Sequence, residues 1–282
     1  MKLTIIAGAR PNFIKIAPLI HSIKKVGETK IQYRLIHTGQ HYDKKMSDTF
    51  FDELNIPHPD LNLNVGSGTQ ANQTGQIMIR FEEDLQNNPT DFVIVVGDVN
   101  STLACSVVAK KMNTGLIHIE AGIRSFDMSM PEEVNRMVTD ALADYFFTTT
   151  EYATNNLLKQ GVENHRIFHV GNIMIDSLTA NRSKFTEPDF WKKYNLSEEK
   201  YWLLTLHRPS NVDDEENLLQ LLKLIDENSK GLPIIFPVHP RTNAKMNGFS
   251  HKFKNIIPID PQSYLNFMFL IKNSIGVVTD SG

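Results

Sequence analysis

The chain has 282 residues, of which 29 are basic and 32 are acidic, so its formal net charge is −3 at neutral pH. This near balance gives no general electrostatic reason to bind nucleic acid or an anionic membrane, and any phosphate binding must be local. The hydrophobic share of 41% is enough for ordinary cores, and the length favours two domains. A single cysteine excludes an internal disulfide framework.

The sequence shows neither a signal-peptide pattern nor a candidate membrane span. The amino terminus runs directly into an apolar strand pattern, and no apolar stretch approaches the roughly 18 residues of a membrane helix. These features predict a soluble cytoplasmic protein. Cys105 lies among small and apolar residues of an expected helix, which predicts that it is buried. The histidines show no zinc-binding spacing, so no metal site is expected.

In the first part of the chain, expected strands alternate with expected helices. The strands are expected at residues 3–7, 33–37, 92–97, 116–120, 145–149 and 166–170. The helices are expected at residues 11–25, 43–54, 73–85, 100–111, 132–143 and 151–160. Strands separated by helices of this length imply a parallel sheet with right-handed crossovers and helices on both faces. The sequence therefore predicts an α/β fold of the Rossmann-like type.

A polar and irregular segment, residues 181–191, indicates a boundary between two domains. We expect an amino-terminal domain over residues 1–172 and a carboxyl-terminal domain over residues 173–282. The second domain is expected to contain strands at 202–207, 233–239, 256–259 and 275–279 and helices at 213–227 and 264–271. Such a domain would be unusually small for a doubly wound fold, so we predict that it is incomplete.

Three carboxylates and two arginines are candidates for one site. Asp98 and Glu120 each follow an apolar run that is typical of a buried strand, and Glu132 begins the next helix. The carboxyl ends of parallel strands meet at the crevice where α/β sheets bind ligands. Asp98 is also a residue type that caps helices, and Glu132 also complements a helix dipole, so a structural role stays open for both. Arg124 and Arg136 are cations able to hold anionic substrate groups or to tune carboxylate pKa values.

Basic residues follow other predicted strands. Arg10 and Lys15 lie at the first strand-to-helix junction, where a helix amino terminus with two cations is typical of an anion site, although a plain turn is the alternative. His207-Arg208 and His239-Pro-Arg241 each combine an imidazole with an arginine at a strand end, which suits a diphosphate. The segment Gly66–Ala71 matches a GxGxxA pattern, but the residues before it alternate in polarity, which favours a Gly-rich loop over a dinucleotide site.

These motifs, in this order, resemble the non-hydrolysing UDP-N-acetylglucosamine 2-epimerases, a family with the two-domain GT-B fold. The matching segments are Gly8–Lys15, Thr38–His41, Val96–Thr102, His118–Arg124, Met130–Arg136, Val170–Asn172, Thr205–Arg208, Pro237–His239, Asp260–Gln262 and Thr279–Gly282. The resemblance implies an inversion at C2 of the sugar without a cofactor. UDP would be eliminated to give a 2-acetamidoglucal and would add back after C2 is reprotonated on the other face, which gives UDP-N-acetylmannosamine.

The resemblance also implies roles for individual residues. Asp98, Glu120 and Glu132 would be the acid/base or intermediate-stabilising carboxylates, and His207 would assist at the diphosphate. Phe267 would face the uracil, although its helix position is more often a core position. The implied substrate-binding residues are Arg10, Lys15, Arg124, Arg136, Arg208, His239, Phe267, Asp280, Ser281 and Gly282. A second, activating UDP-N-acetylglucosamine site maps to Gln40, His41, Arg208 and His239. The expected partners are the UDP-sugar substrate and a second copy in a homodimer.

The sequence departs from the family pattern in two motifs and at its end. Asn12 follows Gly-Ala-Arg-Pro where Gly-Thr-Arg-Pro-Glu is commoner, and the segment Leu206–Asn211 lacks an acid beside the histidine. The first variant resembles a branch that acts on UDP-2,3-diacetamido-glucuronic acid, so this substrate stays open. A GT-B glycosyltransferase and a non-catalytic UDP-sugar-binding module are further alternatives. The family continues beyond the motif that ends at Gly282, which predicts a truncated and impaired chain.

Overall fold

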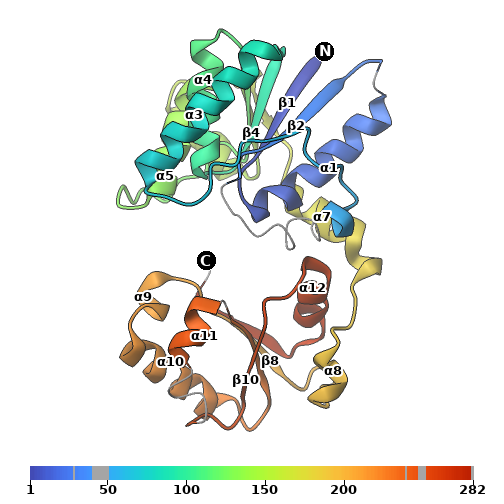
Figure 1. Cartoon of the computed structure of the whole chain (residues 1–282), viewed down its shortest axis with the longest axis vertical. Helices are drawn as coiled ribbons and strands as arrows, with labels where there is room; N and C mark the ends of the chain where they lie inside the picture. Colours follow the sequence, from blue (N-terminus) through green and yellow to red (C-terminus); the bar gives the residue numbers. More distant parts are fainter. Residues whose placement is uncertain (28, 40–50, 239, 247–251, 281–282) are drawn as a thin grey trace. The chain divides into compact units, whose positions relative to one another are not determined.

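The computed structural model describes residues 1–27, 29–39, 51–238, 240–246 and 252–280. The chain divides into two compact units, residues 1–181 and 182–282, and each unit is built on a parallel sheet (Figure 1). The predicted α/β class with two Rossmann-like sheets is confirmed. The division falls later than the predicted 172/173 boundary, because α7 (Ile173–Asn181) packs against α1 (Arg10–Val26) of the first unit.

The first unit contains a seven-stranded sheet in the order β3-β2-β1-β4-β5-β6-β7. The strands are β1 (Lys2–Ala7), β2 (Gln32–His37), β3 (Leu61–Asn62), β4 (Phe92–Val96), β5 (Gly115–Ile119), β6 (Tyr145–Thr148) and β7 (Ile167–His169). From β1 the chain passes to β2 on one side, whereas from β4 it passes to β5 on the other. The boundary between β1 and β4 is therefore a topological switch point, where open α/β sheets bind ligands.

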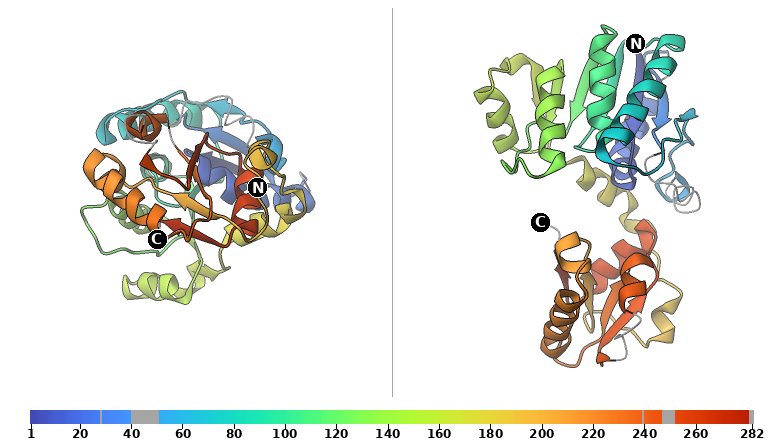
Figure 2. Two further views of the ribbon diagram at one scale, coloured as in Figure 1. Left: turned by 90° about the horizontal axis from the view of Figure 1, so that it is seen from below. Right: turned by 60° about the vertical axis from the view of Figure 1, so that its left-hand side comes forward.

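Helices cover both faces of this sheet (Figures 1 and 2). On one face α3 packs on α4 and α4 packs on α5, while α1 and α7 pack together on the other face. Right-handed crossovers that run in opposite directions from a switch point place their helices on opposite faces. The helices are α3 (Gln70–Asn87), α4 (Asn100–Lys111), α5 (Pro131–Leu142) and α6 (Glu151–Lys159), with a 3₁₀ turn at Asn164–Arg166.

The apolar runs that predicted the central strands are the core of the first unit. Ile5 of β1 and Val93 and Val95 of β4 are completely buried, as expected for strands covered by helices on both faces. Cys105 of α4 is also completely buried in this core, which confirms the prediction, and burial raises the pKa of its thiol. Of the predicted helix 43–54, residues 51–54 are helical, and the earlier residues lie outside the described ranges.

The second unit contains a four-stranded sheet in the order β10-β9-β8-β11. Its strands are β8 (Trp202–Thr205), β9 (Ile234–Pro237), β10 (Ile256–Ile259) and β11 (Gly276–Thr279). Its helices are α8 (Phe190–Lys193), α9 (Pro209–Val212), α10 (Glu215–Asn228), α11 (Pro240–Met246) and α12 (Tyr264–Asn273), after a 3₁₀ turn at Arg182–Lys184. Since β8 leads to β9 on one side and β11 returns on the other, a second switch point lies between β8 and β11.

Most of the elements that the sequence did not predict are short. The strand β3 has only two residues, and α9 and α11 both begin at a proline, which is favoured at the first helical position. The helix α7 falls inside the segment that we interpreted as the start of the second domain. None of the described helices is both long and apolar enough to cross a lipid bilayer.

Candidate active site

The carboxyl ends of β4 and β5 bring Asp98 and Glu120 to the same edge of the first sheet. Val96 and Ile119 are register partners, and the Gly97 amide donates to the Ile119 carbonyl at 3.0 Å. Glu120 is paired with Lys15 of α1, with 2.5 Å between Nζ and Oε2. Both side chains are largely buried, at 13% and 10% exposure. The structure therefore places Lys15 of the first strand-to-helix junction beside the acid that follows β5.

The backbone of Glu120 has an unusual conformation. Its φ is +69°, which lies in the left-handed region that side chains other than glycine rarely adopt. Its amide and that of Ala121 both donate to the Phe147 carbonyl of β6, at 3.0 and 3.1 Å. Strain of this kind persists where surrounding contacts over-determine the conformation, and it clusters at functional sites. The turn is thus built to direct the Glu120 carboxylate toward Lys15.

Asp98 is held by α5 and does not cap the helix that follows it. The N-cap of α4 is Val99, which has no side-chain cap bond, whereas Asp98 pairs with Arg136 at 2.5 Å between Oδ2 and Nη2. Asn135 also donates to the Asp98 carbonyl at 2.7 Å. Of the two interpretations that the sequence left open, helix cap or site residue, the geometry favours the second. The predicted proximity of Arg136 to the acids is also present.

The two glutamates at the start of α5 are placed very differently. Glu132 is exposed at the second helical position, whereas the Glu133 side chain is only 1% exposed. Glu133 accepts hydrogen bonds from the amides of Ser125 and Phe126 at 2.9 and 3.2 Å, and it pairs with Arg136 at 3.0 Å. The sequence pattern predicted a site role for Glu132 and none for Glu133. A glutamate at the third helical position often turns back onto the preceding backbone, and that signal could have identified Glu133.

In the second unit, His207 and Asp280 meet at the switch point between β8 and β11. His207 Nδ1 lies 2.9 Å from Asp280 Oδ1, and the Asp280 carboxylate also accepts from the amides of His207 and Arg208. Asn211 donates to the same carboxylate at 3.0 Å. Burial opposes ionisation of Asp280, but these donors and the charge of His207 hold its pKa below its usual value. The His207 side chain itself is 62% exposed.

Two of the predicted substrate-binding residues, Asp280 and Arg124, form ion pairs within the chain. Asp280 is only 7% exposed, because its oxygens accept from the His207 loop and do not point to solvent. Arg124 is 2% exposed and pairs with Asp140 of α5 at 2.7 Å. The Arg124 guanidinium is thus held inside the first unit, and its one donor without a partner, Nε, is buried as well. Both charged groups are therefore engaged within the chain, and their contacts with substrate stay predictions.

The structure does not describe some of the other residues that we predicted to bind substrate or an activator. His239, Ser281, Gly282, Gln40 and His41 lie outside the described residues, and so does the side chain of Arg10. Arg208 is exposed beside His207, and Phe267 packs partly buried on a core cluster of the second unit. Among the residues that the structure describes, no group of His, Cys, Asp and Glu is arranged to hold a metal ion.

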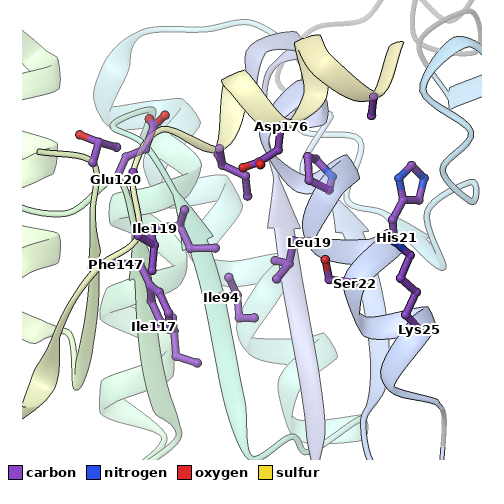
Figure 3. A pocket seen from close by; sticks show the side chains of 16 residues that line it. Leu19, His21, Ser22, Lys25, Ile94, Ile117, Ile119, Glu120, Phe147 and Asp176 are labelled. Atoms are coloured by element: carbon purple, nitrogen blue, oxygen red, sulfur yellow. The ribbon is translucent and has the colours of Figure 1, made fainter. Parts of the chain in front are cut away.

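A cavity of the first unit lies on the α1 face of the sheet and is separate from the Asp98 pair. It measures about 570 Å³ and is lined by α1, α7 and the strands β4, β5 and β6 (Figure 3). Ile94, Ile117 and Phe147 form its sheet side, and Glu120 lies at one end. Its mostly aliphatic lining does not suit a diphosphate, whereas the polar edge with Asp98, Arg136 and Lys15 does.

Comparison with known proteins identifies the family. Residues 24–282 match the model of the UDP-N-acetylglucosamine 2-epimerase family. The chain belongs to this family. It is 43% identical to the UDP-N-acetylglucosamine 2-epimerase of Methanocaldococcus jannaschii over an alignment of 294 positions, which covers all of this chain and 79% of the relative. It is 37% identical to a UDP-2,3-diacetamido-2,3-dideoxy-D-glucuronate 2-epimerase of Pseudomonas aeruginosa, with 100% and 78% covered.

Solved structures of epimerases from this family have the same fold. The crystal structure of the M. jannaschii enzyme in complex with UDP-GlcNAc and UDP matches with a TM-score of 0.88 at 42% identity, covering 100% of this chain and 79% of that chain. The Neisseria meningitidis enzyme bound to UDP-GlcNAc matches with a TM-score of 0.87 at 29% identity, covering 100% and 78%. The family resemblance that the motifs predicted, with its GT-B fold, is thus confirmed.

The epimerase motif Gly8–Lys15 is tied to β4 through Asn12, the residue that departs from the common pattern. Asn12 Oδ1 accepts from the amides of Gly8 and Ala9 at 3.1 and 2.9 Å, and its Nδ2 donates to the Val96 carbonyl at 3.0 Å. A side-chain amide can both donate and accept, which an ionised glutamate cannot do. Asn12 therefore links the first turn to the strand that carries Asp98.

We predict that Asp280→Asn weakens catalysis through His207. The neutral amide cannot accept from all the donors that now converge on the carboxylate, so the His207 loop loses its fixed orientation. If His207 assists at the diphosphate, kcat should fall by about 10-fold to 100-fold. The double variant with His207→Gln should be no slower than His207→Gln alone, because the two residues act as one unit. Steady-state assays check this, with exposed Glu187→Gln as the control. Additive losses would contradict it.

We also predict that Glu133→Gln makes the protein less stable and less sensitive to acid. Burial alone raises the pKa of Glu133, but the hydrogen bonds from Ser125, Phe126 and Arg136 outweigh burial and lower the pKa. A lowered folded-state pKa stabilises the protein above the unfolded-state value, and this stabilisation is lost as pH falls through the folded-state value. The variant should lose about 1.5–3 kcal/mol at pH 7. Thermal melts from pH 7 to pH 3 should show a shallower decline than for wild type or exposed Glu83→Gln.

Proposed function

We propose that this chain catalyses inversion at C2 of UDP-N-acetylglucosamine to give UDP-N-acetylmannosamine. The observation that carries the proposal is the pair of carboxylates at adjacent strand ends, Asp98 and Glu120, each held by its own cation. Membership of the epimerase family supports the same reaction. The relatives named above include an M. jannaschii epimerase whose structure contains UDP-GlcNAc and UDP.

The chemistry explains why carboxylates and cations are needed together. The C2 hydrogen is barely acidic, so its removal must be coupled to departure of UDP as a stabilised diphosphate. A base takes the C2 proton, the electron pair forms the C1–C2 double bond, and the C1–O bond breaks with its electrons passing to UDP. The product is a 2-acetamidoglucal. Protonation of C2 from the other face, with return of the UDP oxygen to C1, completes the inversion without a cofactor.

We assign acid/base and intermediate-stabilising roles to Asp98, Glu120 and Glu132, and a role at the diphosphate to His207. The cations Lys15 and Arg136 orient the first two carboxylates in the absence of substrate. An anionic substrate group offers each cation a second partner, which frees its carboxylate for proton transfer. Water must be excluded during this step, because the glucal would otherwise be protonated without control.

The test is conversion of UDP-N-acetylglucosamine in deuterated water, followed by proton NMR. The expected result is appearance of the manno isomer with deuterium at C2. The absence of both conversion and C2 deuterium uptake on a panel of UDP-2-acetamido sugars would exclude the proposal. If the Asp98→Asn variant still transfers sugar to an acceptor, the result would instead favour a glycosyltransferase. Tight binding of UDP-sugars without turnover would favour a binding module.

A second substrate has specific support. The chain is 37% identical to a Pseudomonas aeruginosa epimerase named for UDP-2,3-diacetamido-2,3-dideoxy-D-glucuronate, and the Gly8–Pro11 motif resembles that branch. The two substrates differ at C3 and C6, where the second carries an acetamido group and a carboxylate. Comparing kcat/KM for both in the same assay decides between them. A larger value for the glucuronate would assign the chain to that branch.

We further propose that the protein forms a homodimer. Large apolar side chains are exposed on α5 and on the loop before it, at Phe126, Met128, Met130, Val134 and Met137. Exposed apolar patches of this kind mark interaction surfaces. Light scattering after size-exclusion chromatography should give twice the chain mass, and a monomer at micromolar concentration would contradict this. The cytoplasmic location stays a prediction from the sequence.

A further inference from the structure

A buried pair of side chains, His118 and Asp140, lies behind the two turns that carry Asp98 and Glu120. His118 of β5 and Asp140 of α5 are 1% and 2% exposed, with 2.6 Å between Nδ1 and Oδ1. The other ring nitrogen of His118 lies 2.9 Å from the Gly97 carbonyl oxygen. A carbonyl only accepts hydrogen bonds, so Nε2 donates to the Gly97 carbonyl, and a second hydrogen bond joins Nδ1 to the Asp140 carboxyl group.

Asp140 is ionised because it has three partners. Burial opposes its ionisation, but His118 and Arg124 hold the pKa of the carboxyl below its usual value. Its second oxygen accepts from Arg124 at 2.7 Å and from the Gly122 amide at 3.0 Å. Arg124 is itself anchored on the Ile123 carbonyl at 2.7 Å. The cluster is therefore one carboxylate between an imidazole and a guanidinium, closed off from solvent.

The pair is bonded to both turns that carry the candidate acids. His118 holds the carbonyl of Gly97, the residue directly before Asp98. Asp140 holds the amide of Gly122, two residues after Glu120. Gly97, Glu120 and Gly122 all have positive φ, at 70°, 69° and 78°. This conformation differs from that of an extended strand, so each turn depends on contacts with other parts of the fold. A single rigid unit thus sets the backbone at both turns.

We infer that His118 and Asp140 are positioning residues that fix the separation and direction of Asp98 and Glu120; this rests on the proposed epimerase function. Neither side chain reaches substrate, because both are buried. Replacing a buried ion pair with apolar residues is often neutral or stabilising, so the contribution of the pair to folding alone does not explain it. A displacement of about 1 Å in a catalytic group can cost 100-fold in rate.

The test compares variants that keep, remove or replace the pair. His118→Phe should lower kcat by about 100-fold while KM for UDP-N-acetylglucosamine changes less than about threefold, since the binding groups are untouched. His118→Gln, which keeps a donor for the Gly97 carbonyl, should recover a substantial part of kcat. The double variant His118→Phe with Asp140→Leu should fold but stay slow. Deuterium uptake at C2 should fall in parallel with kcat.

Asp144→Asn is the matched control. Asp144 accepts from the Leu116 amide at the opposite end of β5 and pairs with Lys110, so this variant perturbs the same strand away from the acids. Its melting temperature should fall while kcat per folded molecule is unchanged. Melts and circular dichroism establish the folded fraction of every variant, and the apolar double variant is the fallback if His118→Phe does not fold.

The outcomes separate the inference from the function on which it rests. If the unaltered protein neither converts UDP-N-acetylglucosamine nor takes up deuterium, the proposed function fails and the inference fails with it. If the unaltered protein is active and kcat per folded molecule is unchanged in His118→Phe, only the inference is overturned. Recovery of full activity in the apolar double variant would also overturn it, because a merely stabilising pair would be replaceable.

Discussion

Glu120→Gln is expected to lower kcat for epimerisation by about 100-fold to 10,000-fold, the range in which a positioned acid or base contributes. The glutamine keeps the size of the side chain and still accepts a hydrogen bond from Lys15, which now lies 2.5 Å from the carboxylate. It cannot take up or deliver a proton. Because the backbone conformation at Glu120 is set by contacts with Phe147, the turn should be retained and the loss should be chemical.

The measurement for Glu120→Gln is the initial rate of conversion together with C2 deuterium uptake. Glu82→Gln is the control, because Glu82 is an exposed glutamate on α3 of the same unit. A rate for Glu120→Gln within about threefold of wild type would remove Glu120 from the chemistry and leave Asp98 and Glu132 as the candidate acids. If deuterium uptake persists while the isomer does not form, Glu120 acts on one face of C2 only.

Gly122→Ala is expected to destabilise the fold by about 2–5 kcal/mol, from left-handed backbone strain together with overpacking. Gly122 has a φ of +78°, and a Cβ at this position would lie 2.3 Å from the Ala153 carbonyl oxygen. The contact is with the backbone of α6, which cannot swing away as a flexible side chain can. The Gly122 amide also donates to Asp140, so relief of the clash would disturb the buried ion pair.

Urea unfolding measures the loss in Gly122→Ala. Gly75→Ala is a matched control, because Gly75 lies inside α3, has no positive φ and has open space within 4 Å of the position that a Cβ would take. That control should stabilise the protein by about 0.5–1 kcal/mol. Equal unfolding midpoints for the two alanine variants would show that α6 gives way and that close packing at Gly122 does not constrain the fold.

The location of Asp98 and Glu120 was predictable from the sequence, because both residues follow strands. Asp98 and Glu120 follow apolar runs, and the parallel arrangement of such runs places their carboxyl ends at one edge of a sheet. The partners of these acids were less predictable. Lys15 and Glu120 are 105 residues apart in the chain, and Asp98 and Arg136 are 38 apart. The sequence suggested cations near the acids but not which cation pairs with which acid.

The roles of the buried charges were not predictable in the same way. Glu132 and Glu133 are adjacent and identical in type, and only their positions around α5 decide that Glu133 is buried and Glu132 is exposed. The position of Arg124 near the acids in the sequence predicts a contact with substrate. Its burial against Asp140 follows from packing of α5 on the first sheet, which no local pattern encodes.

By itself, the sequence determined the alternation of strands and helices, the α/β class, the family and the strand-end acids. These follow from local periodicity and from motif order, because side chains alternate in strands and recur every 3.6 residues in helices. Only the tertiary structure decided which charges pair, which are buried, and that His118 and Asp140 join the two acid-bearing turns. Ion pairs and hydrogen bonds depend on distances of a few ångströms between segments that are remote in the chain, and such distances arise only when the sheet and its helices are packed.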